Sequence, residues 1–475
     1  MKKKLSVIIS MILMISLMTG CTTFNNFKNA FFSDESAISN AQGNEKTIKI
    51  GVYEPLTGEY KTQGNEEKIG IELAHELYPE VLGRKVELIY ADNQGDMYVA
   101  ETVIKELVAQ NPAVILGSYG ETVTLVAGDA IREAQIPSIS LTGTNTLITV
   151  NNPYYFLATF NESKQGYALA DFVCKEHNIN KVATVRVEGD DTVTATVQRF
   201  NSRVKATTGN SDSIVGNYQL AMEQTDFTEQ IEKIKNSGAQ AVFLALSPVK
   251  AEEFLKQVKD AGLENLMYVG TNVLNDEKFL KFVTDQKSFN IAYTTDYAVD
   301  ANTTKMSETF IKAYKNKYGV NAEPTVAMAI AFDGYLMALE GIQKAYDNIM
   351  SVDFQKLSEK DDMSDDEIKE VKNNWMYTQE NGLPPGVMIR EALTKIKNFE
   401  GASGLISFNG TNEADKSAVI NHIINGEVQV PKEETDISGT SSDSSESTSK
   451  DATEGVADKD LKEDISEEGE NTDGN

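Results

Sequence analysis

Residues 47–90 read TIKIGVYEPLTGEYKTQGNEEKIGIELAHELYPEVLGRKVELIY, and this stretch decides the fold prediction. Its ends, residues 47–52 and 86–90, are rich in apolar and β-branched side chains and predict two strands. Between them, apolar side chains recur every four residues from Ile69 to Leu77, which predicts a helix with one buried face. A strand, an amphipathic helix and a second strand form the repeating unit of an α/β fold.

The same alternation continues along the chain. A helix is expected at residues 97–109, and further strands are expected at residues 113–116, 138–141, 181–185, 213–215, 241–245 and 266–269. Strands separated by helices of this length favour parallel sheets that are covered on both faces. Two such series predict two doubly wound lobes, in which a ligand binds beyond the carboxyl ends of the strands at the topological switch point.

The first 21 residues have the layout of a secretion signal. Lys2–Lys4 precede an apolar run from Leu5 to Met18, which is too short to cross about 30 Å of hydrocarbon comfortably. Cys21 directly after a glycine resembles the lipobox of bacterial lipoproteins, although Met18 stands where leucine is commonest. The resemblance implies a signal peptide at residues 1–20 and a lipid on Cys21 that anchors the protein to the cell membrane, on its extracytoplasmic face. The alternative is a secreted protein with an incidental cysteine.

Composition excludes several functions. The formal net charge of −28 argues against nucleic acid as a partner and against electrostatic adhesion to anionic lipid. After Cys21 only Cys174 remains, so the mature chain has no pair of cysteines with which to build a disulfide framework.

Two polar stretches flank the part that is expected to fold. Residues 21–46 have no sustained periodicity and predict a flexible tether. Residues 431–475 contain no aromatic side chain and carry 15 acidic and 4 basic residues, a net charge of −11. A segment of this composition buries too little apolar surface to fold, so we expect a disordered acidic tail.

Short motifs along the folded part resemble, in their order and spacing, the leucine/isoleucine/valine-type solute-binding proteins of ABC importers. The motifs are IGV at 50–52 with PLTG at 55–58, VILG at 114–117, AQIPSIS at 134–140 with TN at 144–145, TDF at 225–227, YK at 314–315 with KYG at 317–319, AFD at 331–333, IREAL at 389–393, and Gly401 with GLISFN at 404–409. The likeness covers about residues 47 to 430.

This resemblance implies the type I periplasmic-binding fold, in which a three-stranded hinge joins two lobes. Lobe 1 would comprise residues 47–161 and 297–403, and lobe 2 would comprise residues 162–296 and 404–430. It also implies a monomer that closes around a small solute and delivers it to ABC permease subunits in the membrane.

The same resemblance implies pocket residues in lobe 1. An aromatic wall of the family aligns with Gln63, beside Tyr60, and a hydroxyl that binds the solute carboxylate aligns with Glu121. The pocket loops around these positions supply the further candidates Tyr119, Gly120, Thr142, Gly143 and Thr144. Small residues and a hydroxyl fit the second of these loops well, whereas a glutamate at position 121 would repel a carboxylate.

In lobe 2 an aromatic covering group of the family aligns with Asp191, a further contact aligns with Ser247, and the acid that binds the solute amine aligns with Asn272. Compared with the family, the pocket would therefore have additional acidic side chains at Glu121 and Asp191 and would lack the usual acidic side chain at Asn272. We expect a cationic, amide-bearing or otherwise polar solute in preference to leucine. There are two alternatives. One is the family default, in which the solute is an apolar amino acid. The other is a diverged homologue that binds another molecule or none.

Motifs of catalysis are missing from the sequence. The histidines are scattered without a paired metal spacing, and no nucleophile elbow, Walker loop or dinucleotide glycine pattern occurs. We expect no enzyme activity, no cofactor and no metal. A ligand-sensing module that partners a membrane receptor is the alternative to transport, because both functions need the same two lobes.

One segment departs from the family pattern. Residues 347–385 form an excursion that contains the only tryptophan, Trp375, and Ser364 with Glu367 has the spacing of a helix capping box. We expect a packed surface insertion, and a partner-docking element is the alternative.

Overall fold

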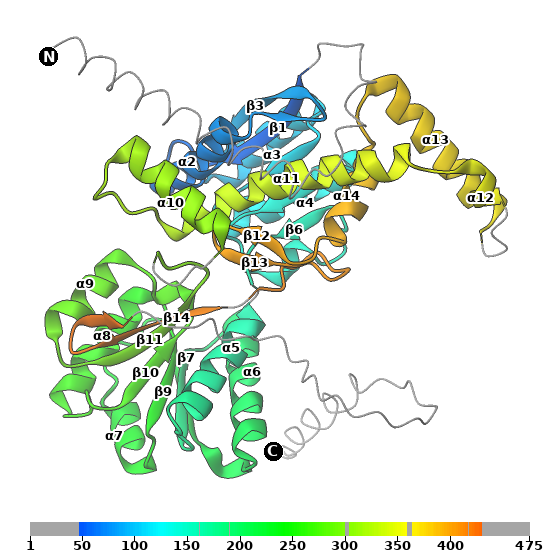
Figure 1. Cartoon of the computed structure of the whole chain (residues 1–475). Helices are drawn as coiled ribbons and strands as arrows, with labels where there is room; N and C mark the ends of the chain where they lie inside the picture. The colour runs from blue at the N-terminus through cyan, green and yellow to red at the C-terminus, as the bar shows by residue number, and fades with distance from the viewer. Residues whose placement is uncertain are drawn as a thin grey trace, which may run out of the picture. The chain divides into compact units, whose positions relative to one another are not determined.

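The computed structural model describes residues 47–160, 162–189, 191–299, 304–358, 363–416 and 418–429 (Figure 1). The predicted signal peptide, tether and acidic tail lie outside these residues. The described chain forms two large sheets and a small one. The prediction of an α/β fold built on parallel sheets is confirmed.

The first large sheet has six strands in the order β2-β3-β1-β4-β5-β6. Its members are β1 (Ile48–Glu54), β2 (Glu80–Val81), β3 (Arg84–Asp92), β4 (Val114–Leu116), β5 (Ser138–Ser140) and β6 (Tyr155–Leu157). All neighbours pair in parallel except the short β2 with β3. Strand β1 lies between β3 and β4, where the strand order reverses, so the switch point of this sheet lies between β1 and β4.

The second large sheet has seven strands in the order β15-β14-β11-β10-β9-β7-β8. Its members are β7 (Val182–Val187), β8 (Ile214–Leu220), β9 (Ala241–Ala245), β10 (Met267–Gly270), β11 (Asn290–Thr295), β14 (Val419–Ile424) and β15 (Glu427–Gln429). The first five pair in parallel, and the switch point lies between β7 and β9. Strands β14 and β15 are antiparallel additions, joined by Asn425-Gly426 with positive φ at both residues, as a two-residue hairpin requires.

Between these sheets the chain passes three times: after β6, after β11 and before β14. The third passage follows the small sheet of β12 (Phe399–Gly401) and β13 (Gly404–Ile406). Ile406, Phe408 and Ala414 still pack with the core of the first sheet, whereas Ala418 packs with the core of the second.

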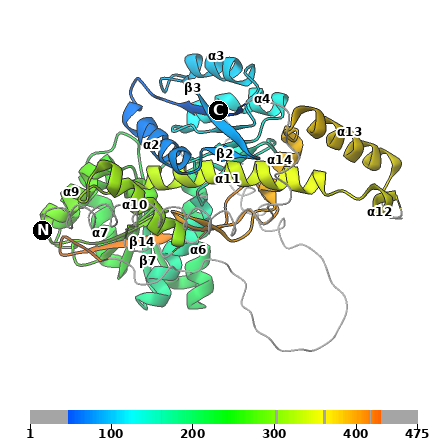
Figure 2. The same ribbon diagram turned by 45° about the horizontal axis from the view of Figure 1, so that its top comes forward.

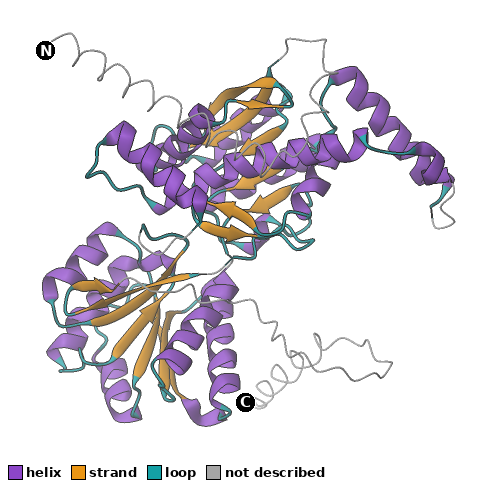
Figure 3. Ribbon diagram, viewed as in Figure 1, coloured by secondary structure: helices purple, strands orange, loops and turns teal. Residues whose placement is uncertain are grey.

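Helices cover both faces of each sheet (Figure 3). Those that pack with the first sheet are α2 (Lys61–Leu77), α3 (Met97–Val108), α4 (Glu121–Ala134), α10 (Lys305–Tyr318), α11 (Val326–Met350) and α14 (Gly386–Thr394). Those that pack with the second are α5 (Glu162–Asp171), α6 (Asp191–Thr208), α7 (Thr228–Ser237), α8 (Pro248–Asp260) and α9 (Glu277–Gln286).

Helix α11 is the central helix of the first group and lies beside α2 (Figure 2). The contact is close because Gly70 has no side chain: a Cβ there would lie 2.2 Å from the carbonyl oxygen of Met328. Helix α11 is long and apolar enough to cross a membrane, but 83% of its most apolar window is buried within the protein. Its apolar character is therefore that of a core helix.

The excursion at residues 347–385 is helical and forms α12 (Phe354–Ser358) and α13 (Asp365–Asn381). The predicted capping box is confirmed, because the Ser364 hydroxyl accepts from the N–H of Glu367 and the Glu367 carboxylate accepts from the N–H of Ser364. Trp375 meets the ring of Phe354 edge-on at 5.6 Å. Helix α13 packs against α11.

Candidate functional site

The loops that follow the parallel strands carry the predicted site residues. Tyr60 follows β1, residues 119–121 follow β4, and residues 142–144 follow β5. In the second sheet Asp191 follows β7, and Ser247 and Asn272 follow β9 and β10. All of them therefore lie at the carboxyl-end edges of the sheets, and β1, β4, β7 and β9 flank the two switch points.

Around the first switch point the structure brings several predicted residues together. Tyr60 precedes α2, and its ring centroid lies 5.9 Å from that of Tyr119. Gln63, one turn into α2, is half-buried. Gly120 precedes α4 with a φ of 98°, and Glu121 begins that helix with an exposed side chain. The Glu121 carboxylate accepts a hydrogen bond of 3.1 Å from the Asn145 amide.

The loop after β5 faces a residue that the sequence analysis did not select. The hydroxyl of Thr142 donates to the carboxylate of Glu67, which lies on α2. Gly143 offers its carbonyl to the Thr159 hydroxyl at 3.4 Å, and the side chain of Thr144 is 9% exposed. Thr142 therefore uses its only donated hydrogen bond inside the protein.

A second buried glutamate, Glu54, ends β1. Its Oε2 accepts a 2.9 Å hydrogen bond from the backbone N–H of Tyr119. Glu54 and Glu67 are both 0% exposed, and their carboxyls lie within hydrogen-bonding reach of each other. The remaining oxygens, Glu54 Oε1 and Glu67 Oε2, have no donor among the described residues. One proton held by the pair supplies the missing donor, because a carboxylic acid donates where a carboxylate only accepts.

Burial sets the acidity of this pair. Removal from water raises the pKa of Glu54 well above its usual value, and the adjacent Glu67 carboxyl raises it further. Burial likewise raises the pKa of Glu67, to about 7, against the effect of its hydrogen bonds with Glu54 and Thr142. Two carboxyls in contact cannot both ionise cheaply. The pair therefore holds a proton near neutral pH.

Gly117 makes the approach of Glu54 to the loop after β4 possible. A Cβ at this position would lie 2.2 Å from the carbonyl oxygen of Tyr53 and 2.3 Å from Glu54 Oε1. Its φ of 108° lies in the region that favours glycine. Any side chain here would displace the Glu54 carboxyl from the Tyr119 N–H.

The predicted residues of the second sheet are less closely linked. Asp191 is the first residue of α6, and its side chain lies outside the described part of the chain. Ser247 caps α8, where its hydroxyl accepts from the N–H of Lys250 at 3.4 Å. The N–H of Asn272 donates to Gln165 Oε1 at 2.9 Å. Gln165 Nε2 is buried without a partner among the described residues.

The three passages between the sheets are joined by a buried network. Lys416, on the third passage, lies 3.3 Å from Asp296 on the second, and the two side chains are 1% and 2% exposed. Asp296 also accepts from the backbone N–H of Phe160 on the first passage. Lys416 Nζ donates to Ser403 Oγ at 2.7 Å, and that hydroxyl donates to Asp333 Oδ2 at 2.6 Å. One lysine thus links all three passages to α11.

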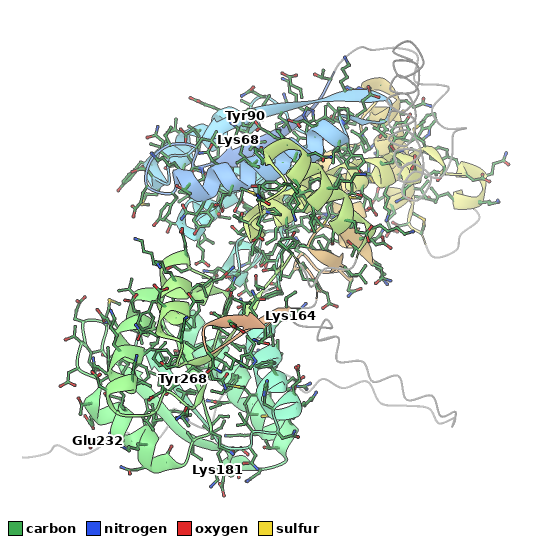
Figure 4. All side chains as sticks on the ribbon, turned by 60° about the vertical axis from the view of Figure 1, so that its left-hand side comes forward. Lys68, Tyr90, Lys164, Lys181, Glu232 and Tyr268 are labelled. Carbon is green, nitrogen blue, oxygen red and sulfur yellow. The ribbon has the colours of Figure 1, made fainter. Side chains whose placement is uncertain are left out.

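Outside this network, Lys164 at the start of α5 also contacts the third passage (Figure 4). Its Nζ donates to the carbonyl of Ala414 at 3.0 Å and pairs with Asp415 at 2.9 Å. An open cavity of about 840 Å³ lies here, lined by Lys164 and by residues 149, 151–153, 408, 409, 411–413 and 415. It contains none of the predicted site residues. Asn412, which lines the cavity, already donates to the carbonyls of Pro153 and Tyr155. We therefore interpret this cavity as part of the junction between the passages of the chain, and not as the solute site.

Two histidines that are far apart in the sequence, His177 and His422, pack against each other. The ring centroids of His177 and His422 lie 5.2 Å apart, and burial lowers the pKa of both, that of His422 to about 4. His422 shares a hydrogen bond with the Asn290 side chain. The described residues contain no group of three potential ligands that could hold a metal ion.

A family model of periplasmic binding proteins matches residues 47–417. The chain belongs to this family. Its members are extracytoplasmic solute-binding proteins, and the resemblance to the leucine/isoleucine/valine type is confirmed. The sheet edges that carry the predicted residues are thus the edges of a type I periplasmic binding fold.

Two curated relatives of this periplasmic binding protein are named as Leu/Ile/Val-binding protein homologues. It is 25% identical over 235 residues to the Leu/Ile/Val-binding protein homolog 3 of Brucella melitensis, which is 48% of this chain and 62% of that protein. It is 24% identical over 293 residues to homolog 6 of Brucella suis, which is 60% of this chain and 73% of that protein. The matched region spans less than two thirds of the first of these relatives.

Solved structures show the same fold. A leucine binding protein from Thermotoga maritima superposes with a TM-score of 0.61 and 22% identity, over 81% of this chain and 98% of that chain. An isoleucine-bound protein from Streptococcus pneumoniae has a TM-score of 0.60 and 22% identity, over 82% and 99%. A solute binding protein from Rhodopseudomonas palustris, in complex with 3,4-dihydroxybenzoic acid, has a TM-score of 0.59 and 20% identity, over 82% and 98%.

Sequence reasoning missed Glu54 and Glu67, although each had a signal. Glu54 is a buried charged residue that ends a strand in which only Lys49 is otherwise charged. Glu67 lies four residues before Ile71 on the buried face of α2. A charge at a buried position of a regular pattern is rare and indicates a specific partner.

Proposed function

We propose that this protein captures a small polar solute between two lobes and delivers it to an ABC importer. The observation that supports this function most directly is the concentration of the predicted site residues on the carboxyl-end loops of two parallel sheets, at the switch points and on the loops next to them. Open α/β sheets bind ligands at these points. The lobes are the units built on the two sheets, and the packing of residues 406–414 with the first core favours a third crossing nearer to residue 415 than to residue 403.

Within this proposal the solute is cationic or amide-bearing. Glu121 is exposed at the start of α4 and places a negative charge where a carboxylate-binding hydroxyl is expected. Asn272 binds an ammonium less strongly than an acid would, so we assign the attraction for a positive group to the lobe 1 side of the pocket. Leucine is a poor fit, because its side chain adds no polar group and its carboxylate would be repelled by Glu121.

A thermal-shift screen of amino acids, amides, polyamines and short peptides is expected to identify the solute. A ligand that binds only the folded protein at a hundredfold excess over Kd stabilises it by about 2.7 kcal/mol. Cationic or amide-bearing compounds should raise the Tm more than leucine does. Glu121→Ser should weaken the native ligand and improve the binding of apolar amino acids, with the exposed Glu133→Ser on the same helix as the control. Leucine as the tightest ligand, with Glu121→Ser silent, would refute the polar-solute proposal.

We also propose that a lipid on Cys21 anchors the protein. Two acyl chains hold a protein stably at a membrane, whereas a single chain does not. Cys21→Ser is expected to release the protein into the soluble fraction or to block its maturation, while Cys174→Ser leaves its distribution unchanged. Membrane fractionation with an antibody to the protein measures both. A Cys21→Ser variant that stays fully bound to the membrane contradicts the anchor.

A further inference from the structure

Three hydrogen-bond donors on the loops after β4 and β5 bond to the chain's own carboxylates. The Tyr119 backbone N–H donates to Glu54 at 2.9 Å, the Thr142 hydroxyl donates to Glu67, and the Asn145 amide donates to Glu121 at 3.1 Å. Free backbone N–H groups and hydroxyls at helix starts would suit an anionic group of a ligand. In this protein, these donors are already hydrogen-bonded to carboxylates of the chain itself.

The inward-facing carboxyls are held by the core and do not move aside readily. Glu54 and Glu67 are 0% exposed, and for Glu54 Oε1 and Glu67 Oε2 the described residues offer no donor other than the proton that the pair shares. A solute carboxylate that competed for Thr142 or Tyr119 would leave a buried glutamate with one hydrogen bond fewer. Loss of such a bond to a buried acceptor is costly. The Thr142 hydroxyl, whose proton points to Glu67, offers only its lone pairs to a ligand.

We infer that Glu54 and Glu67 are positioning residues that set the specificity of the proposed solute site. They turn the donors of the loops after β4 and β5 inward, so that the wall built by these loops accepts hydrogen bonds and takes the donor-bearing end of a solute, such as an ammonium, a guanidinium or an amide N–H. The inference rests on the proposed solute-binding function and deepens it by naming the group that lobe 1 selects. It assigns the selection to two residues that touch the loops and not the solute.

Two substitutions of Glu67 distinguish a role in positioning the loop donors from a purely structural role. Glu67→Met removes the acceptor, which frees the Thr142 hydroxyl to donate to a solute. Glu67→Gln keeps an oxygen that accepts from Thr142 and adds an N–H that donates to Glu54, so it reproduces the hydrogen bonds of the pair with its shared proton. Glu72→Met and Glu72→Gln are matched controls on the same helix, because the partners of Glu72, Lys68 and Tyr90, lie on the outer surface (Figure 4).

The measurement is the ratio of Kd values for leucine and for arginine amide, determined by calorimetry on the full-length protein and each variant. Arginine amide carries an ammonium, a guanidinium and an amide but no carboxylate. We expect Glu67→Met to shift the ratio by about tenfold or more toward leucine, and Glu67→Gln and both Glu72 variants to keep it within about threefold.

An unchanged ratio in a folded Glu67→Met protein overturns the inference and leaves the proposed function in place. If Glu67→Met does not fold, Glu67→Gln decides, because a shift toward leucine despite the retained hydrogen bonds overturns the inference as well. A wild-type protein that binds no member of the solute panel contradicts the proposed function itself, and the inference falls with it.

Discussion

Replacement of Lys416 with methionine is expected to lower the free energy of unfolding by about 3–5 kcal/mol. Lys416 is almost fully buried, and its ammonium lies 3.3 Å from Asp296, which is equally buried. The variant keeps the volume of the side chain but leaves the Asp296 carboxylate without its counter-charge. It also removes the donor to Ser403, whose hydroxyl supports Asp333. Burial already raises the pKa of Asp333 to about 6, so this carboxylate tolerates little further loss of support.

Urea denaturation at pH 7 measures this effect. Lys397→Met, which removes an exposed lysine near the same small sheet, should change the free energy of unfolding by no more than about 0.5 kcal/mol. The double variant Lys416→Met with Asp296→Asn should regain part of the loss, because removal of both charges leaves no ion unpaired. A loss below about 1 kcal/mol in the single variant would mean that water or another group compensates Asp296, and that the network does not join the three passages energetically.

A second large effect is expected from pH. The free energy of unfolding of the wild-type protein should fall by up to about 3 kcal/mol between pH 4.5 and 7 through the Glu54–Glu67 pair. The folded protein keeps a proton on Glu67 up to about pH 7, whereas an unfolded glutamate loses it near its ordinary pKa of 4.5. The folded state therefore binds more protons in this window, so a rise in pH favours the unfolded state.

The groups around the pair strengthen this expectation. Among the described residues, those that interact electrostatically with the pair are the tyrosines Tyr53, Tyr119 and Tyr155 and the carboxyl of Glu66. None of these residues carries a positive charge that would stabilise a second carboxylate. Other carboxyls titrate in the same window, so the diagnostic quantity is the difference between variants.

Glu67→Gln should remove the contribution of Glu67 and leave that of Glu54, whose pKa is raised mainly by burial, so the variant should gain stability over the wild type as the pH rises from 5 to 8. The exposed-face variant Glu72→Gln on the same helix should follow the wild-type profile. Urea midpoints across this pH range measure the difference. Parallel profiles for wild type and Glu67→Gln would show that Glu67 does not hold a proton in the folded state up to about pH 7.

Local patterns were sufficient for much of the architecture. The four-residue spacing from Ile69 to Leu77 predicted α2, and the apolar runs predicted the parallel strands, because a chain of alternating strands and helices has few ways to bury both. The capping box at Ser364 was also readable, since both of its hydrogen bonds join residues three apart. The hairpin of β14 and β15 was not predicted, although Asn425-Gly426 is a strong turn signal.

The candidate site was predicted in its location and only partly in its composition. The family resemblance placed Tyr119, Glu121 and Thr142 just beyond the carboxyl ends of neighbouring strands, where the structure has them. Their roles as ligand contacts stay a prediction. The spacing did not show that the Tyr119 N–H and the Thr142 hydroxyl already have partners, because those partners lie 65 and 75 residues away in the sequence.

The sequence by itself determined the class of fold, the family and the edges of the sheets where a solute is expected, because these follow from periodicity and from motifs a few residues long. The tertiary structure alone decided which charges meet. Glu54 and Glu67 become a proton-sharing pair only when α2 packs over the end of β1, and Lys416 finds Asp296 only when the third passage returns beside the second. Such contacts depend on the removal of water and on the approach of distant segments, and neither is encoded in the spacing of residues along the chain.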